Sequence, residues 1–176
     1  MYLKNKNVLI TGAGKGIGLS TVIECLNEGA NVFALTKTKD DLKHLKKNQN
    51  LNIYYGDVNN PKIIKKIFLY SKKIKKPINC LVNNAGVRQR KSFDSITDKD
   101  LRSLFNVNFF SIFKIIQIFI KNLKKNEKKN IILLVDPTKK KSINNFKFLV
   151  SLGFDKNKIK SYIAPQYNPK KIIDPK

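Results

Sequence analysis

The sequence predicts an α/β fold with one parallel β-sheet, doubly wound so that helices cover both of its faces. Five short apolar runs alternate along the chain with stretches in which apolar residues recur at helical spacing. The apolar runs are continuous and do not alternate with polar residues, which is typical of strands buried on both faces. A chain of 176 residues is long enough for one such domain with a sizeable core.

A predicted helix separates the first two predicted strands along the chain. Residues 7–11, Asn-Val-Leu-Ile-Thr, read as a short buried strand. Residues 16–27 have helical spacing, and Gly29 behind them is a typical helix-ending glycine. Residues 31–35, Asn-Val-Phe-Ala-Leu, predict the second strand.

The middle of the chain repeats this alternation. Residues 39–47 predict a short helix, and residues 51–55 predict the third strand. A helix is expected over 61–73, because Pro61 stands at a favoured first-turn position and the apolar residues behind it follow helical spacing. Residues 79–82 predict the fourth strand.

A long helix and a fifth strand complete the pattern. Thr97 and Asp100 resemble a capping box, with Asp in the Glu position, and predict a helix that runs to about Leu123. Residues 130–135 predict the fifth strand.

The alternation stops at Val135, and the last 40 residues contain four of the six prolines. A short helix over 144–153 and a short strand over 159–164 are expected there. We therefore divide the chain into a sheet domain, 1–136, and a divergent, irregular tail, 137–176.

Composition excludes several classes of protein. Two cysteines do not make a disulfide framework or a four-thiolate zinc site, and one histidine excludes a His-rich metal centre, so we expect no metal. The longest apolar stretch, 109–120, contains Lys114 and Gln117 and is too short to span a bilayer. The N-terminus lacks the apolar core of a signal peptide. These observations predict a cytoplasmic, reduced protein.

The net charge of +24 raises the alternative of a lysine-rich, polyanion-binding protein. Only three of the 36 basic residues are arginine, the residue type that reads bases and grips phosphates with two hydrogen bonds. Lys, Asn and Ile all have A/T-rich codons, so a biased genome is the simpler cause of the charge. We therefore expect solvated lysine faces and no specific nucleic-acid partner.

A glycine-rich run lies between the first strand and the first helix. It reads Thr11-Gly12-Ala13-Gly14-Lys15-Gly16-Ile17-Gly18. Glycines there let the backbone approach a pyrophosphate closely, and the helix N-terminus offers N–H groups and a partial positive charge to it. The position of the run, after a strand and before a helix at the start of the alternating pattern, indicates a dinucleotide-binding loop.

With these residues the chain resembles a short-chain dehydrogenase/reductase over about residues 5–135. Thr11 to Gly18 match that family's TGxxxGxG cofactor motif. The three other matching motifs are Asn83-Asn84-Ala85-Gly86 after the fourth strand, Asp57-Val58 after the third strand, and Asn108 within the long helix. The resemblance implies a Rossmann-like sheet in the order 3-2-1-4-5, NAD(P) as cofactor and hydride transfer involving a carbonyl or alcohol substrate. It assigns Asp57 and Val58 to the adenine, and Asn108 to a catalytic proton relay; helix packing or capping is an alternative role for Asn108.

The second strand ends in Thr36-Lys37-Thr38, without the acid that NAD-preferring folds use to bind the ribose 2′-hydroxyl. Lys37 is suited to pair with a 2′-phosphate. Lys15 occupies a position where family members that use NADP often carry a basic residue. We therefore expect NADP, with NAD as the less favoured alternative.

The sequence does not match the family's catalytic Ser, Tyr and Lys as clearly as it matches the cofactor motifs. The resemblance implies a Ser after the fifth strand, where only Thr138 offers a hydroxyl, and a Tyr about 13 residues later, where none stands. Tyr167 and Lys171 have the YxxxK spacing, but prolines on both sides of Tyr167 disfavour the required helix.

These observations favour an NADP-dependent oxidoreductase and leave open a nucleotide-binding remnant without turnover. A truncated or frameshifted gene, or a rebuilt tail, would each account for the last 40 residues. The resemblance also implies self-association through the long helix, because the family's second interface helix is not recognisable here.

Overall fold

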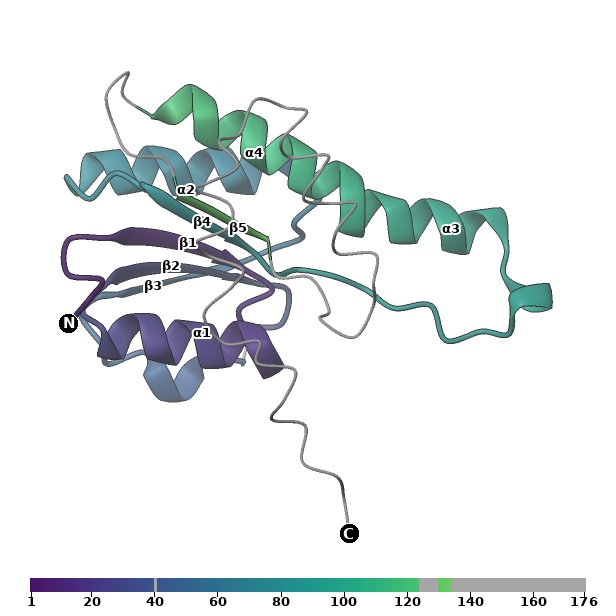
Figure 1. The fold of residues 1–176 in the computed structure, drawn as a ribbon, viewed down its shortest axis with the longest axis horizontal. Helices are drawn as coiled ribbons and strands as arrows, with labels where there is room; N and C mark the ends of the chain where they lie inside the picture. Colours follow the sequence, from purple (N-terminus) through teal and green to yellow (C-terminus); the bar gives the residue numbers. More distant parts are fainter. Residues whose placement is uncertain (40, 124–129, 134–176) are drawn as a thin grey trace, which may run out of the picture. The chain divides into compact units, whose positions relative to one another are not determined.

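The computed structural model describes residues 1–39, 41–123 and 130–133, and its strands and helices alternate as the hydrophobic pattern predicts (Figure 1). All strand pairs are parallel, and the sheet order β3-β2-β1-β4-β5 confirms the predicted topology. The strands are β1 (Asn7–Thr11), β2 (Asn31–Thr36), β3 (Leu51–Tyr55), β4 (Cys80–Asn83) and β5 (Asn130–Leu133).

Helices cover both faces of the sheet. Helix α1 lies on one face, and α2 and α4 lie on the other, while α3 extends α4 towards the right of the view (Figure 1). The helices are α1 (Gly16–Asn27), α2 (Pro61–Lys73), α3 (Asp98–Phe105) and α4 (Ser111–Asn122), and short 3₁₀-helical turns occupy Lys43–Leu45 and Phe93–Ser95.

The two faces of each strand supply two separate apolar layers, because successive side chains point to opposite sides. On the α1 face, Val8 and Ile10 of β1 belong to one buried cluster with Val32, Ala34, Val22 and the thiol of Cys25. On the opposite face, Leu9 pairs in register with Phe33 and Leu81, and all three are buried. Each fully buried large side chain of this kind stabilises the fold by about 1.5–3 kcal/mol.

Helices α2 and α4 pack on this second face. The rings of Phe68 and Phe119 lie 6.2 Å apart between centroids, and both residues are buried. Ile64, Ile67 and Ile115 are also buried at helical spacing. The buried residues of α2 and α4 therefore form one inward side on each helix.

The predicted helix over 39–47 is wrong, since the described residues of this segment form only the single 3₁₀-helical turn Lys43–Leu45. Leu42 is fully buried and Leu45 packs on the same cluster, so two apolar residues anchor one turn. Lysines fill most of the remainder, and they supply no further buried face for a longer helix.

The long helix begins at Thr97, as predicted. The Thr97 hydroxyl accepts from the backbone N–H of Asp100, and the Asp100 carboxylate accepts from the backbone N–H of Thr97. This capping box is the one that the sequence indicates. The helix passes through a π-helical turn, Asn106–Phe110, between α3 and α4.

The resulting helix, Asp98–Asn122, is long and apolar enough to cross a membrane by length and composition alone. The expectation of no membrane span rested on the apolar stretch 109–120 alone, although the sequence predicts the helix from Thr97 to about Leu123 that the structure shows. Ile115, Ile116 and Phe119 of this helix are buried in the fold, but only 17% of its most apolar 18-residue window is buried.

Candidate functional site

The glycine-rich loop lies at the carboxyl end of β1, immediately before α1, as the sequence predicts. Gly12 has φ +62°, a backbone conformation that side chains disfavour. A Cβ at Gly12 would lie 2.7 Å from the Cα atom of Ala85. A larger residue at position 12 would therefore separate the loop from the segment that follows β4.

The first turn of α1 leaves its N–H groups open. Lys15 is the N-cap, and its side chain makes no capping hydrogen bond; the first turn contains no acid. A Cβ at Gly16 would meet only open space, whereas one at Gly18 would overlap the carbonyl oxygen of Gly12. Ile17 projects outwards and is 64% exposed. Uncapped N–H groups and a partial positive helix end fit an anionic pyrophosphate.

Thr11 and Asn84 join the two loops. The Thr11 hydroxyl oxygen accepts from the backbone N–H groups of Asn84 and Ala85, each at 3.1 Å. The Asn84 side-chain amide donates to the carbonyl oxygens of Thr11 at 3.1 Å and Gly12 at 2.9 Å. Four hydrogen bonds therefore clamp the glycine-rich loop to the Asn84–Gly86 segment, two predicted motifs that lie about 70 residues apart in the sequence.

Asn108 holds the next part of that segment. Its side-chain Oδ1 accepts from the Val87 backbone N–H at 2.8 Å, and its Nδ2 donates to the Val87 carbonyl at 2.9 Å. A Cβ at Gly86 would approach Asn108 Oδ1 to 3.4 Å. The side chain comes from the π-helical turn, a helical irregularity that is frequent at functional sites. Asn108 thus positions the segment after Gly86, whatever further role it has.

The predicted adenosine end contains an ion pair. Lys37 Nζ lies 3.1 Å from Asp57 Oδ2, and the lysine side chain is 81% exposed. The backbone N–H of Asn59 donates to Asp57 at 2.8 Å and lowers the pKa of that carboxyl, and Lys37 lowers the pKa further. Asp57 is therefore a stable carboxylate, and the half-buried Val58 directly follows it.

Sequence reasoning missed Asp41, which the structure brings to the glycine-rich loop. The Thr36 hydroxyl donates to Asp41 Oδ2 at 2.7 Å, and Lys15 Nζ lies 3.8 Å from Asp41 Oδ1. The sequence pattern of dinucleotide-binding folds predicts an acid only at the strand end, here 36–38. Asp41 stands five residues after Thr36, and no periodicity of the sequence indicates that the chain turns back there.

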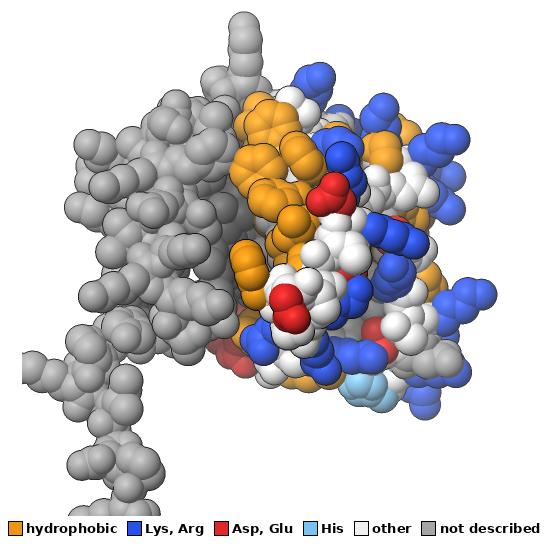
Figure 2. Space-filling model, turned by 90° about the vertical axis from the view of Figure 1, so that its right-hand side faces the viewer, with side chains coloured by type: hydrophobic (Ala, Val, Ile, Leu, Met, Phe, Trp, Pro, Cys, Tyr) orange, Lys and Arg blue, Asp and Glu red, His pale blue; other side chains and the backbone are white. Residues whose placement is uncertain are grey.

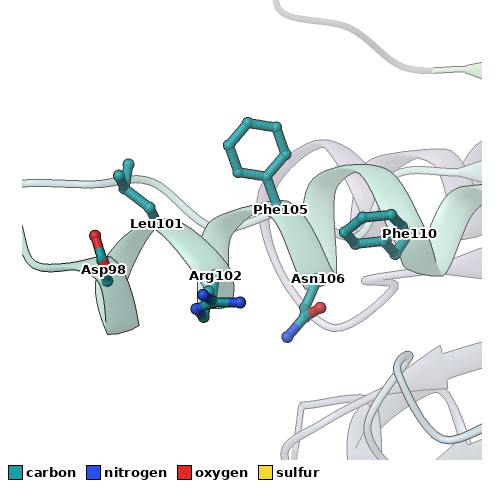
Figure 3. Close-up of a pocket in the computed structure, with 6 residues that line it drawn as sticks. All are labelled: Asp98, Leu101, Arg102, Phe105, Asn106 and Phe110. Carbon is teal, nitrogen blue, oxygen red and sulfur yellow. The ribbon is translucent and has the colours of Figure 1, made fainter.

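A separate hollow of about 370 Å³ lies along the first half of the long helix (Figure 3). Figure 3 shows Leu101 and Phe105 on one side of this helix, and Arg102 and Asn106 on the other. None of the predicted cofactor or catalytic residues within the described part of the chain lines it. Its described lining residues are Asp98, Leu101, Arg102, Phe105, Asn106 and Phe110.

The same helix carries a partly exposed apolar side. Figure 2 shows hydrophobic side chains gathered in one band, with lysines and arginines spread over the rest of that face. Several of the large apolar side chains that are 41–52% exposed belong to the long helix: Leu101, Phe105, Phe109, Phe110, Phe113 and Ile120.

The structure tests only part of the predicted site. Thr138, Tyr167 and Lys171, as well as the elements expected over 144–153 and 159–164, lie outside the described residues. Among the described residues, no group of three or more His, Cys, Asp or Glu side chains could hold a metal ion.

Comparisons with known proteins agree with this geometry. A family model described as short chain dehydrogenase matches residues 6–145. L-xylulose reductase of Mus musculus is 31% identical over 122 residues, which cover 69% of this chain and 48% of the relative. The 3-oxoacyl-[acyl-carrier-protein] reductase FabG of Thermotoga maritima is 30% identical over 139 residues, which cover 75% of this chain and 56% of the relative.

A solved structure supports the fold. The crystal structure of a short-chain dehydrogenase from Streptomyces avermitilis matches 73% of this chain and 49% of that one, with a TM-score of 0.66 and 22% sequence identity. The chain thus spans about half the length of the proteins to which it is similar.

Proposed function

The chain belongs to the short-chain dehydrogenase family, and from this premise we propose that it is an NADP-dependent oxidoreductase. The substrate class is a small molecule with a carbonyl or secondary alcohol group. One observation carries the proposal: the glycine-rich loop, which leads into the N-terminus of α1, is joined by hydrogen bonds to the Asn84–Gly86 segment at the carboxyl edge of the sheet. Ligands of open α/β sheets bind at this edge.

The residues of this edge fit a dinucleotide. The N–H groups of Gly16, Ile17 and Gly18 suit the pyrophosphate, because the N-cap residue Lys15 makes no capping hydrogen bond with its side chain. Asp57 and Val58 would hold the adenine, as the family pattern implies. When bound, the nicotinamide supplies or accepts a hydride.

The preference for NADP rests on the two lysines at the ribose end. Lys15 and Lys37 both project into solvent, and the strand end Thr36-Lys37-Thr38 contains no acid. An ammonium group pairs more strongly with a 2′-phosphate than with a neutral hydroxyl.

A cofactor-binding remnant with little turnover is the second candidate function. It is favoured by the absence of Tyr from 149–155, where the family pattern places its acid/base residue, and by Pro165 and Pro169 around Tyr167. A phenol is a poor base at neutral pH without a neighbouring cation, and general acid/base catalysis typically contributes 10²–10⁴-fold.

Two measurements separate these functions. Calorimetric titration with NADPH tests binding, and a panel of simple carbonyls tests turnover. Both functions require NADPH binding. Measurable turnover supports the oxidoreductase, and turnover barely above background, which we expect for simple carbonyls, supports the remnant. If turnover is robust, Tyr167→Phe should abolish it without a change in NADPH affinity.

The matched control is Tyr2→Phe, because Tyr2 and Lys6 have the same YxxxK spacing and Tyr2 is 91% exposed at the N-terminus. Turnover that survives Tyr167→Phe would exclude the Tyr167–Lys171 pair. A lack of NADPH and NADH binding would refute the proposed function itself.

A further inference from the structure

The carboxylate of Asp41 lies against the glycine-rich loop, beside Gly14 and Lys15. Its side chain is only 10% exposed, although the loop around it lies at the surface. The hydroxyl of Thr36, the last residue of β2, donates to one carboxylate oxygen, and the ammonium group of Lys15 lies near the other. Asp41 therefore connects the end of β2 to the start of α1.

Gly14 makes room for this carboxylate. A Cβ at position 14 would overlap Asp41 Oδ2 and the Thr36 hydroxyl oxygen, and it would lie 2.6 Å from Asp41 Cβ. Such contacts require one of the groups to shift. The second glycine of the loop thus accommodates a side chain of this protein, and the carboxylate lies directly against the loop backbone.

Two ion pairs, Lys37–Asp57 and Lys15–Asp41, lie near the end of β2, and their acidic members differ in exposure to solvent. Lys37 and Asp57 are both exposed, with side-chain exposures of 81% and 40%, so water screens this pair and its members are free to separate. Asp41 is nearly buried and fixed by Thr36. A phosphate that binds beside Lys15 therefore meets a negative charge that does not move away.

We infer that Asp41 is a specificity-determining residue for the cofactor: it opposes a 2′-phosphate and limits the preference for NADP that Lys15 and Lys37 provide. A ribose hydroxyl is neutral and does not experience this repulsion. The protein therefore binds both dinucleotides, with NADPH favoured by less than about tenfold. This inference rests on the proposed function, since it requires NAD(P) at this loop.

The test is the isosteric change Asp41→Asn. It removes the charge and keeps an oxygen that accepts the Thr36 hydrogen bond. We expect NADPH to bind about tenfold more tightly and NADH affinity to change less than about twofold, with the NADPH gain reduced at high salt. Glu24→Gln is the control, because it removes the same charge from an exposed position on α1, the helix that follows the glycine-rich loop.

Each outcome decides between the two proposals. If Asp41→Asn is folded and the ratio of NADPH to NADH affinity does not change, Asp41 does not set specificity, while the proposed function stands. If Asp41→Asn does not fold, Asp41→Ser removes the same charge. The ratio of NADPH to NADH affinity of the wild type is a second, independent measurement. A wild-type preference for NADPH above about a hundredfold overturns the inference, and binding of neither dinucleotide overturns both.

Discussion

Substitution of Thr11 tests the hydrogen bonds that join the glycine-rich loop to the Asn84–Gly86 segment. It is 1% exposed, and its hydroxyl oxygen accepts two backbone N–H groups, those of Asn84 and Ala85. Thr11→Val keeps the shape of the side chain and removes the acceptor. Thr11→Ser keeps the acceptor and removes one methyl group. The pair of variants therefore separates the contribution of the hydrogen bonds from that of packing.

The two variants should lower the free energy of unfolding by different amounts. In Thr11→Val two partly buried N–H groups lose their partner, and each such loss costs about 1–2 kcal/mol, so we expect a total of about 2–4 kcal/mol. Thr11→Ser should cost about 0.5–1.5 kcal/mol, as the removal of a buried methyl group does. Because domains of this size are stable by about 5–15 kcal/mol, both variants should fold at low temperature.

Urea unfolding followed by far-UV circular dichroism measures these differences. Thr21→Val is the matched control, because the Thr21 hydroxyl donates to the carbonyl of Ile17 on the exposed side of α1, and its loss should change stability by at most about 0.5 kcal/mol. Thr11→Val should also weaken NADPH binding, since two of the four hydrogen bonds that join the loops are lost. The reasoning is refuted if Thr11→Val is as stable as Thr11→Ser and binds NADPH as the wild type does.

Three further predictions concern charge, surface and thiols. Lys37→Asp should weaken NADPH binding about tenfold and improve NADH binding relative to wild type, and Lys37→Gln should be measured beside it because the new carboxylate would face Asp57. Equal affinities for both dinucleotides in wild type and variant by calorimetry would contradict this. The exposed apolar side of the long helix should cause self-association, and a clean monomer by light scattering at high concentration, without dye binding, would argue against it. Burial raises the pKa of Cys25 to about 11 and that of Cys80 to about 12, so at pH 8 about one Cys25 in a thousand is thiolate; labelling with a thiol reagent should be slow until urea unfolds the chain, and fast labelling of the native protein would show that the thiols are accessible.

The sequence predicted the sheet well because its signals are local. The apolar runs at 7–11 and 51–55 coincide with β1 and β3 at both ends. The capping box at Thr97 also follows from residues three apart, which any helix brings together. The order of the strands followed from the family resemblance, which the family model and the solved relative bear out.

The helix expected over 39–47 shows where local signals fail. Lysine-rich residues with two leucines are compatible with a helix, and only the contact of Leu42 with the core beneath α1 limits the segment to one turn. The extent of the long helix was predicted from its capping box, but the membrane expectation was based only on the apolar run at 109–120, which is shorter than the helix Asp98–Asn122.

The sequence by itself determined the parallel sheet and the glycine-rich loop, and its resemblance to the family identified the Asn84–Gly86 segment, Asp57 and Asn108. The sheet and the loop depend on residue types at short spacings, and backbone geometry converts such spacings directly into turns, strands and helix ends. Only the tertiary structure decided that Thr11 clamps the two loops, that Asn108 binds the backbone of Val87, and that Asp41 returns to Gly14 and Lys15. These contacts join residues from different elements, and their formation depends on how loops close over the packed sheet, which no pattern within a single segment specifies.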